Sequence, residues 1–228
     1  MPRHLPAARV GIRPAQRASA LAAGVRARRD VSGARRRRRR PGRGRLKRCW
    51  ETSDAAYLAY HDEEWGQPVT DERGLYERLC LEGFQSGLSW LTILRKREAF
   101  RVAFAAFDPD LVAGFGERDI ERLLGDAGIV RHRGKIEAAI ANARGTIALR
   151  DAGTPLEHVV WEYRRDGPVP GEWQAQTPGS VELSKRLRKA GFRFVGPTTV
   201  YSTMQACGIV NDHIATCFVR DAVERERH

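Results

Sequence analysis

The chain has 228 residues, 42% of them hydrophobic, and a formal net charge of +12 at pH 7. That length suffices for one domain, or two small ones, with a core that needs no disulfides, and no apolar run approaches the roughly 18 residues that span a bilayer. Four cysteines without close pairing and no secretory leader exclude a secreted disulfide scaffold and favour a soluble protein in a reducing, intracellular setting.

The positive charge is concentrated at the N-terminus. Residues 1–48 contain 17 lysines and arginines and one acid, Asp30, and so carry +16, whereas residues 49–228 carry −4. The arginine run at 35–40 repels itself and buries no apolar surface, so we expect residues 1–47 to be a disordered basic tail. Three roles stay open for it: an arm that attracts nucleic acid, an organellar targeting peptide, or an extension with no fixed role, such as an overlong start of the reading frame.

From Cys49 onward the spacing of apolar residues is helical almost throughout. Asp54 can cap a turn that runs to His61, with Tyr57, Tyr60 and His61 on one face. Further helical runs are expected at residues 73–84, 89–107, 117–124, 133–149 and 155–163, and Asp108-Pro109 ends the second of them. Residues 165–179, rich in Pro, Gly and Gln, are expected to form an exposed connection. No segment alternates like a strand, so the sequence predicts an all-α domain at residues 48–220 and a short C-terminal tail at 221–228.

A hairpin between two helices is predicted near the end of the domain. A basic helix begins near Ser180, Gly191 can end it in a left-handed cap, and Gly196-Pro197 opens the next helix. The unpaired N–H groups at the start of that second helix can hold an anion such as a DNA phosphate. Positive charge flanks the hairpin at Lys185, Arg186, Arg188, Lys189 and Arg193. From this segment alone, phosphate binding and an ordinary hairpin with a solvated basic face are about equally supported.

Two cysteines and two histidines are placed so that they could close one metal site. Cys49 and His61 lie near the start of the domain, and His213 and Cys217 lie four residues apart near its end. Structural zinc prefers four tetrahedral Cys and His ligands, and residues four apart on a helix point the same way. The spacing taken alone slightly favours unrelated buried thiols and imidazoles over such a staple.

Several segments occur together in the order found in one known family. They are Cys49-Trp50, YLAYHDEEWG at 57–66, LEGFQSGLSW at 81–90, GIVRHRGKI at 128–136, FVG at 194–196 and MQACGIVNDH at 204–213. With them the chain resembles 3-methyladenine DNA glycosylase I, of the helix-hairpin-helix DNA glycosylase superfamily, over about residues 48–218. The resemblance implies an all-α fold in which a structural Zn²⁺, held by Cys49, His61, His213 and Cys217, ties the two ends of the domain together.

One difference from the family concerns the first metal ligand. Familiar members have an extra residue between the first cysteine and the following tryptophan, whereas Cys49 and Trp50 are adjacent here. The position of Cys49 is therefore the part of the ligand set that the structure has to test. Cys80 and Cys207 are expected to be structural thiols.

The resemblance also implies an activity. The protein is expected to flip 3-methyladenine out of alkylated double-stranded DNA and hydrolyse its bond to the sugar, in base excision repair. We expect a monomer in the cytoplasm or nucleoid of a bacterium. Pro197, Thr198 and Thr199 stand where a lysine nucleophile would permit strand cleavage, so the enzyme should be monofunctional.

Roles for individual residues follow from the motif match. Glu82 is the leading catalytic and base-recognition residue, because a partly buried carboxylate accepts from the exocyclic amine and favours a cationic base. Tyr60 and Trp90 are the expected stacking walls and Tyr57 a supporting group, although periodicity alone would place these rings in the core. Leu88 is a candidate wedge in the duplex. The hairpin residues expected to bind DNA are Phe194, Val195, Gly196 and Thr198.

Two other classes of function compete with this interpretation. A noncatalytic helix-hairpin-helix module would bind DNA without chemistry, but plain phosphate binding requires neither Glu82 nor the aromatic rings. A zinc hydrolase would need an open coordination position, which four protein ligands do not leave. Asp212 follows the hairpin, where related enzymes carry a catalytic aspartate, and also precedes His213; we favour support of the metal ligand.

Overall fold

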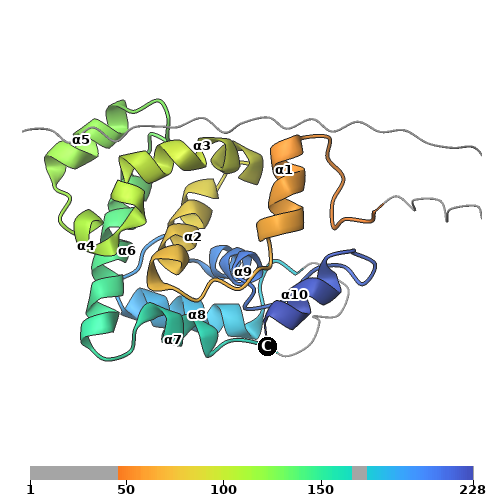
Figure 1. Ribbon diagram of the computed structural model, residues 1–228. Coiled ribbons are helices and arrows are strands. Elements are labelled where there is room, and N and C mark those ends of the chain that lie inside the picture. The colour runs from red at the N-terminus through yellow and green to blue at the C-terminus, as the bar shows by residue number, and fades with distance from the viewer. Residues whose placement is uncertain (1–45, 166–173, 228) are drawn as a thin grey trace, which may run out of the picture. The chain divides into compact units, whose positions relative to one another are not determined.

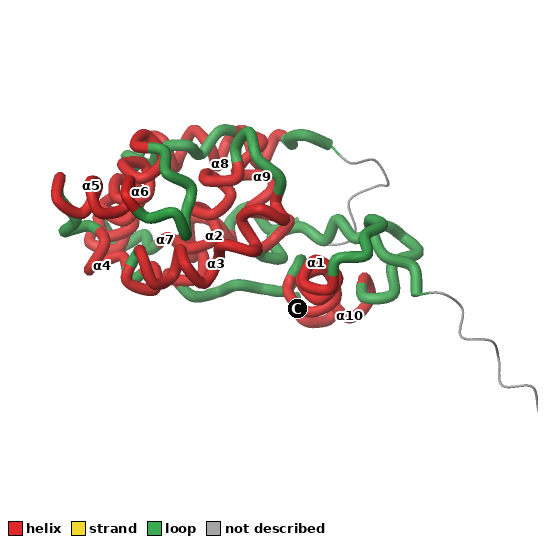
Figure 2. The backbone as a smooth tube through the Cα atoms, turned by 90° about the horizontal axis from the view of Figure 1, so that it is seen from above, coloured by secondary structure: helices red, strands yellow, loops and turns green. Residues whose placement is uncertain are grey.

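The computed structural model describes residues 46–165 and 174–227. Within these ranges the chain forms helices and turns and contains no β-strand, which confirms the predicted all-α class (Figures 1 and 2). None of the described helices is both long and apolar enough to cross a membrane. The predicted basic tail lies almost entirely outside the described residues, as do residues 166–173 of the predicted connection.

The first helices begin at polar caps that the sequence supplies. Asp54 accepts a hydrogen bond from the Tyr57 N–H at 3.0 Å and opens α1 (Ala55–Ala59), which continues into η1 (Tyr60–Glu64), a π-helix. The wider turn of η1 is closed by the Trp65 N–H, which donates to the Tyr60 carbonyl at 2.8 Å. Asp71 caps α2 (Glu72–Gln85) and Ser89 caps α3 (Trp90–Ala103) in the same way.

The helical run expected at residues 89–107 ends earlier than its apolar spacing suggests. After α3, the short helix η2 (Ala105–Phe107) has positive φ angles at all three residues and buries Phe107 in the core. Asp108 then caps α4 (Pro109–Val112), with Pro109 at the first helical position. The next helices are α5 (Glu117–Gly125), α6 (Arg133–Asp151) and α7 (Leu156–Trp161).

The predicted hairpin is present between α8 (Pro178–Lys189) and α9 (Pro197–Ala206). Gly191 adopts a φ of +91° and ends the first helix in the left-handed region, as expected from its sequence position. Residues 221–228, expected to be a short tail, instead belong mostly to α10 (Arg220–Glu226). Val223 is fully buried, and the Arg227 guanidinium donates to the carbonyls of Gly208 and Ile209, so this segment packs against the domain.

Helix α2 lies at the centre of the fold. It packs against α3, α6, α7 and α9, which surround it (Figure 1). Because it is covered on most sides, consecutive residues from Leu79 to Phe84 are all buried, including the charged residue Glu82. Helices α1 and α10, from opposite ends of the described chain, lie on the same side of the domain, with α10 below α1 in Figure 1.

Candidate active site and metal centre

A pocket of about 200 Å³ opens between α1, η1, α2, α3 and α9. This volume is below the roughly 300–1,000 Å³ of sites for drug-sized ligands and is of the right order for one flat bicyclic base. Its lining combines one acid, rings and amides: Trp50, Tyr57, Tyr60, Trp65, Glu82, Gln85, Trp90, Ser202 and Gln205. Recesses of about 440 and 320 Å³ elsewhere are larger, but neither brings a buried acid together with stacked rings.

Glu82 is the charged group of the pocket. Glu82 is 5% exposed, and no group in the described part of the chain donates a hydrogen bond to its carboxyl. Burial raises the pKa of Glu82 to about 8, and the positive charge of Arg78 opposes that rise. An unsatisfied, buried carboxyl in a pocket is a functional-site candidate, because it has to be matched by a ligand that donates hydrogen bonds or carries positive charge.

The rings form a continuous aromatic wall beside this acid. The centroids of Tyr60 and Trp90 are 5.2 Å apart, and those of Tyr57 and Tyr60 are 6.4 Å apart with planes inclined by 27°. The indole N–H of Trp90 is buried and has no hydrogen-bond partner among the described residues. The wall therefore offers both stacking surface and a free donor.

Asp212 is connected to the pocket rather than to the imidazole that follows it. Its Oδ2 accepts from the Tyr201 hydroxyl at 2.5 Å and from Gln205 Nε2 at 2.7 Å. Because the Gln205 N–H is held by this carboxylate, the amide of a pocket-lining residue has a fixed orientation. Support of His213 by Asp212, the role we favoured from sequence, is not found among the described contacts.

The four expected metal ligands converge on one point. The ligand atoms of Cys49, His61, His213 and Cys217 all lie within 4.8 Å of one another, so the cluster could hold a metal ion. The sulfur atoms of Cys49 and Cys217 lie 3.2 and 3.4 Å from His213 Nδ1, and Cys217 Sγ lies 3.5 Å from His61 Nε2. Cys49 thus takes part despite its direct junction with Trp50, and the cluster joins the two ends of the described domain.

Each histidine of the cluster is oriented by a second group. His61 Nδ1 lies 2.8 Å from Asp62, which is held in turn by a bidentate pair with Arg48, and His213 Nε2 lies 3.0 Å from the Trp65 carbonyl. Such partners fix which ring nitrogen faces a metal. Burial lowers the pKa of both histidines, that of His213 to about 4, and so maintains the neutral form that ligates metals.

Two glycines allow the chain segments of the metal cluster to approach. Gly66 and Gly208 have φ angles of +85° and +73°. A Cβ on Gly208 would lie 2.6 Å from the Gly66 carbonyl oxygen, and one on Gly66 would lie 2.9 Å from His213 Nε2. Only glycine fits both the conformation and the space at these two positions.

The residues expected to contact DNA lie on two neighbouring segments. Leu88 is 42% exposed in a turn at the end of α2, and Phe194 is 39% exposed in the hairpin with a φ of +55°. Gly83 on α2 faces Phe194 closely, since a Cβ there would lie 3.4 Å from the Phe194 Cβ. Thr198 is exposed at the start of α9, whereas the Val195 side chain is buried and its carbonyl accepts from Ser184. Val195 can therefore present only its backbone N–H.

The sequence interpretation anticipated part of this site. The structure brings Tyr57, Tyr60, Glu82 and Trp90 into one pocket, as the motif match suggested. The sequence interpretation assigned no role to five other residues that line the pocket: Trp50, Trp65, Gln85, Ser202 and Gln205. Trp50, Trp65, Gln85 and Gln205 lie inside the quoted motifs, so a signal was present there, whereas Ser202 stands in an unremarkable helical run.

Known proteins are similar to this chain in sequence and in fold. The chain matches the family described as Methyladenine glycosylase over residues 50–220. It is 50% identical over 179 residues to the DNA-3-methyladenine glycosylase 1 of Escherichia coli K12 and 40% identical over 177 residues to the DNA-3-methyladenine glycosylase of Haemophilus influenzae. Each of these alignments covers 75% of this chain and 96% of the relative.

Solved structures agree with these relatives. A crystal structure of 3-methyladenine DNA glycosylase I matches with a TM-score of 0.73 at 49% identity, covering 75% of this chain and 98% of that one. The Staphylococcus aureus enzyme, solved to explain 3-methyladenine recognition, matches with a TM-score of 0.71 at 38% identity, covering 74% and 93%. Since the relatives are matched over nearly their whole length, this chain belongs to the methyladenine glycosylase family.

Proposed function

We propose that this protein excises 3-methyladenine from alkylated double-stranded DNA by hydrolysing the bond between the base and its sugar. The single observation that carries the proposal is the buried carboxyl of Glu82 on the wall of a base-sized pocket otherwise lined by rings and amides. A noncatalytic DNA-binding module, the alternative considered from sequence, has no need of such a pocket.

The reaction depends mainly on recognition of the methylated base. Methylation at N3 makes the base cationic, so it leaves as a neutral molecule while positive charge moves toward the sugar, which water then attacks. Glu82 accepts from the exocyclic amine and, when ionised, favours the cation over neutral adenine. Tyr60 and Trp90 stack on the base and Tyr57 supports them, with cation–π attraction adding about 0.5–2 kcal/mol for the methylated base.

The base has to leave the duplex before it can enter this pocket. Leu88, exposed in its turn, fills the gap in the stack, and the hairpin of Phe194, Val195, Gly196 and Thr198 holds the phosphate backbone. The N–H groups at the start of α9 supply the phosphate contacts, the contribution of Val195 being its backbone.

The reaction stops at base removal. Pro197, Thr198 and Thr199 occupy the start of α9. The described residues that line the pocket include no lysine. Lys135, the nearby buried amine, donates instead to the carbonyls of Phe84 and Ser86 at the end of α2. A Schiff base with the sugar therefore has no candidate nucleophile at the pocket.

The metal is a structural Zn²⁺ bound by Cys49, His61, His213 and Cys217. In a tetrahedral zinc site, bonds of about 2.3 Å to sulfur and 2.0–2.1 Å to nitrogen separate these ligand atoms by roughly 3.5 Å. The sulfur–nitrogen distances of 3.2 to 3.5 Å fit that geometry. Four protein ligands leave no position for a reacting water, so the ion stabilises the fold and takes no part in hydrolysis.

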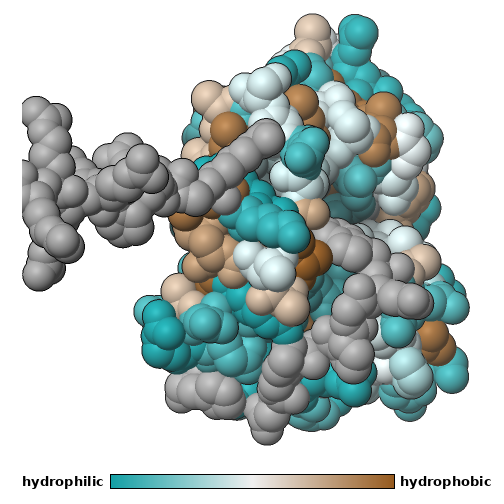
Figure 3. Space-filling model, turned by 90° about the vertical axis from the view of Figure 1, so that its right-hand side faces the viewer, coloured by the Kyte–Doolittle hydropathy of each residue, from teal (hydrophilic) through white to brown (hydrophobic). Residues whose placement is uncertain are grey.

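We further propose that the functional unit is residues 48–220 with α10 packed on it, acting as a monomer on the chromosome in the bacterial cytoplasm. On the face that bears α1 and α10, brown apolar residues are scattered among teal hydrophilic ones (Figure 3). The exposed large apolar side chains of the described residues are Leu46, Leu88, Val102, Leu111, Phe194 and Phe218, and Leu88 and Phe194 are assigned to DNA.

The activity is tested by measuring release of 3-methyladenine from methylated duplex DNA. We expect Glu82→Ala to lower kcat/KM about 10- to 100-fold, because it removes a hydrogen bond to a charged group. Glu98→Ala, which alters an exposed acid on α3, is the matched control and should release base at the wild-type rate. Normal release by Glu82→Ala would refute the role of Glu82.

The metal assignment is tested by elemental analysis of purified protein. Wild-type protein should contain one zinc per chain, and Cys217→Ala should lose it together with several kcal/mol of stability, seen as a lower Tm. Cys80→Ala removes another buried thiol, and its metal content should stay unchanged. Retention of zinc and of Tm in Cys217→Ala would contradict the assignment.

A further inference from the structure

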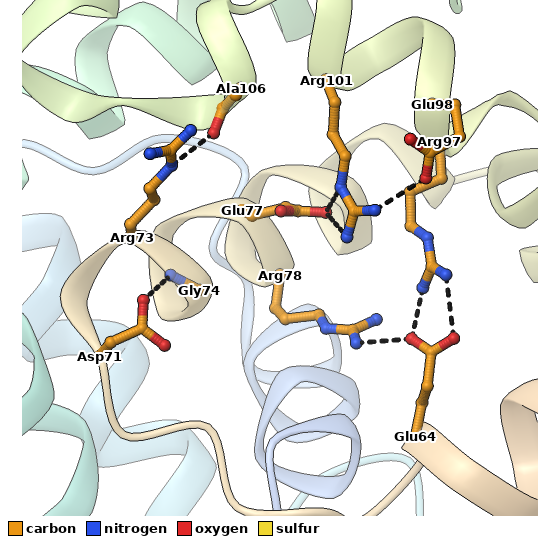
Figure 4. Close-up of polar contacts among 10 residues, drawn as sticks. All are labelled: Glu64, Asp71, Arg73, Gly74, Glu77, Arg78, Arg97, Glu98, Arg101 and Ala106. Atoms are coloured by element: carbon orange, nitrogen blue, oxygen red, sulfur yellow. Dashed lines mark hydrogen bonds and ion pairs between the residues drawn. The ribbon is translucent and has the colours of Figure 1, made fainter. Parts of the chain in front are cut away.

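A partly buried cluster of two arginines and one glutamate lies next to the Tyr60 ring of the pocket. Glu64, the last residue of η1, accepts from Arg97 on both carboxylate oxygens at 2.5 and 2.9 Å, and from Arg78 at 2.9 Å (Figure 4). The side chains of Arg78 and Arg97 are only 11% and 15% exposed. Two guanidinium groups share one carboxylate, so the cluster has one positive charge in excess.

The excess charge belongs to the Arg78 side. Its Nη1 is buried and has no hydrogen-bond partner among the described residues, and its guanidinium carbon lies 5.9 Å from the centre of the Tyr60 ring. A single contact to Glu64 does not account for a buried guanidinium with an unused donor. Arg78 therefore keeps a donor and part of its positive charge that Glu64 does not compensate.

Glu82 is the acid on which this charge acts, although no hydrogen bond joins it to Arg78 among the described contacts. Arg78 and Glu82 are four residues apart in α2, which places both side chains on the same face of the helix. The other titratable groups that act on Glu82 or feel its charge are Tyr57 on α1, Tyr60 on η1 and Cys207 after α9. Burial raises the pKa of each of these three groups, so all are neutral near pH 7. Among the described groups, Arg78 is the one charge that acts on the acid.

We propose that Arg78 is a positioning residue that makes the carboxyl of Glu82 ionisable near neutral pH, with Glu64 and Arg97 fixing its guanidinium next to the pocket. This rests on the proposed function, in which the ionised carboxyl selects a cationic base. Burial by itself drives the acid to its neutral form, which has lost the preference for a positive ligand. The cluster offsets that tendency without occupying the pocket.

The test is the pH profile of kcat/KM for 3-methyladenine release from methylated duplex DNA, measured between about pH 5 and 10. Activity requires ionised Glu82, so its titration in the free enzyme sets the limb where activity rises with pH. In Arg78→Gln this limb moves to higher pH by about one unit or more. The kcat/KM of this variant is then about tenfold below the wild-type value at pH values below the limb and returns to the wild-type value above it. In Glu64→Gln, which leaves both arginines uncompensated, the limb moves to lower pH.

A structural control separates charge from bracing. Arg101 on α3 pairs with Glu77 on α2 and with Glu98, and so joins the same two helices as the cluster (Figure 4). Arg101→Gln should lower Tm and leave the limb in place. If Arg78 only braces α2, then Arg78→Gln, Glu64→Gln and Arg101→Gln each lower kcat/KM by the same factor at every pH. That result would overturn the proposal.

The remaining outcomes are also decisive. Should Arg78→Gln fail to fold, Glu64→Gln carries the test: a shift to lower pH supports the proposal, and no shift or a shift to higher pH overturns it. Wild-type protein that releases no 3-methyladenine at any pH would refute the proposed function itself. Wild-type release with an unmoved limb in every variant refutes only the role of Arg78.

Discussion

Glu82 combines recognition with a penalty on stability. The residue lies in the middle of a helix that is covered on most sides, where an ionised carboxyl is unfavourable unless a ligand or a cation compensates it. Its neighbours on the same helix are apolar and buried, as core packing requires. Selection for base recognition has therefore placed a charge where folding alone would place a hydrophobic side chain.

The raised pKa of Glu82 predicts how stability depends on pH. Between the unfolded pKa, about 4.3, and the folded pKa, about 8, the folded protein binds more protons at this site than the unfolded chain, so its contribution to stability falls as pH rises. Above the folded pKa the contribution is constant. Glu82→Gln removes this dependence, and its Tm should exceed that of the wild type by a margin that grows up to about pH 8 and then levels.

Thermal melts of the two proteins from about pH 5 to 9 measure this margin. We expect the difference in unfolding free energy to reach up to a few kcal/mol, with loss of base release in the same variant. A margin that stays constant with pH would show that Glu82 titrates normally in the folded protein.

At the scale of elements, the hairpin depends on close packing against α6. The buried side chain of Asn142 accepts from the Arg193 N–H at 2.7 Å and donates to the Arg193 carbonyl at 3.2 Å. One turn further along α6, Gly145 faces the ring of Phe192, where a Cβ would lie 2.7 Å from the ring. The hairpin therefore reaches its position because one residue binds its backbone and another leaves room for its side chain.

Gly145→Ala tests this packing. The added methyl group forces the Phe192 ring or the Ala190 carbonyl to move, and we expect a loss of about 1–3 kcal/mol in unfolding free energy together with weaker DNA binding. The control is Gly125→Ala at the end of α5, where nothing lies within 4 Å of the new Cβ. Chemical denaturation and DNA titration measure both effects, and equal behaviour of the two variants would contradict the packing argument.

Elements were predictable where local chemistry determines them. Asp54, Ser89, Asp108 and Gly191 carry caps or turns whose residue preferences are strong, and the structure shows helix starts or ends at each. The π-helix η1 and the positive φ angles of η2 were not predictable, because no local residue preference encodes them; they contain Tyr60 and Phe107, which are buried in the folded chain.

The same distinction applies to the site. The four metal residues and the pocket rings were reached by the order of motifs across the whole chain, since spacing and periodicity alone favoured ordinary core positions. The cluster of Glu64, Arg78 and Arg97 was not anticipated, because its members come from three elements and only their folded arrangement joins them.

At the scale of the whole molecule, the described residues that line the pocket or form the metal cluster all lie at or beyond Cys49. A protein that begins at Leu46 should thus release 3-methyladenine with a kcat within about twofold of the full chain, since bond cleavage depends on the pocket.

The salt dependence of DNA affinity, measured for the full chain and for the protein that begins at Leu46, tests whether the basic tail contacts DNA. An arm that contacts phosphates makes the slope of log affinity against log salt steeper in the full chain, by about 0.9 for each phosphate neutralised. Equal slopes would exclude the arm. A loss of kcat on truncation would contradict the independence of the pocket from the tail.

The position of Cys217 has a consequence for synthesis of the protein. During translation the first two ligands and the tyrosines of α1 and η1 emerge early, but their partners on α9 and beyond emerge last. The Trp65 ring packs against His213 and cannot reach its final packing until then. A nascent or prematurely terminated chain lacking its final segment thus has no assembled pocket, and DNA is not exposed to partly made enzyme.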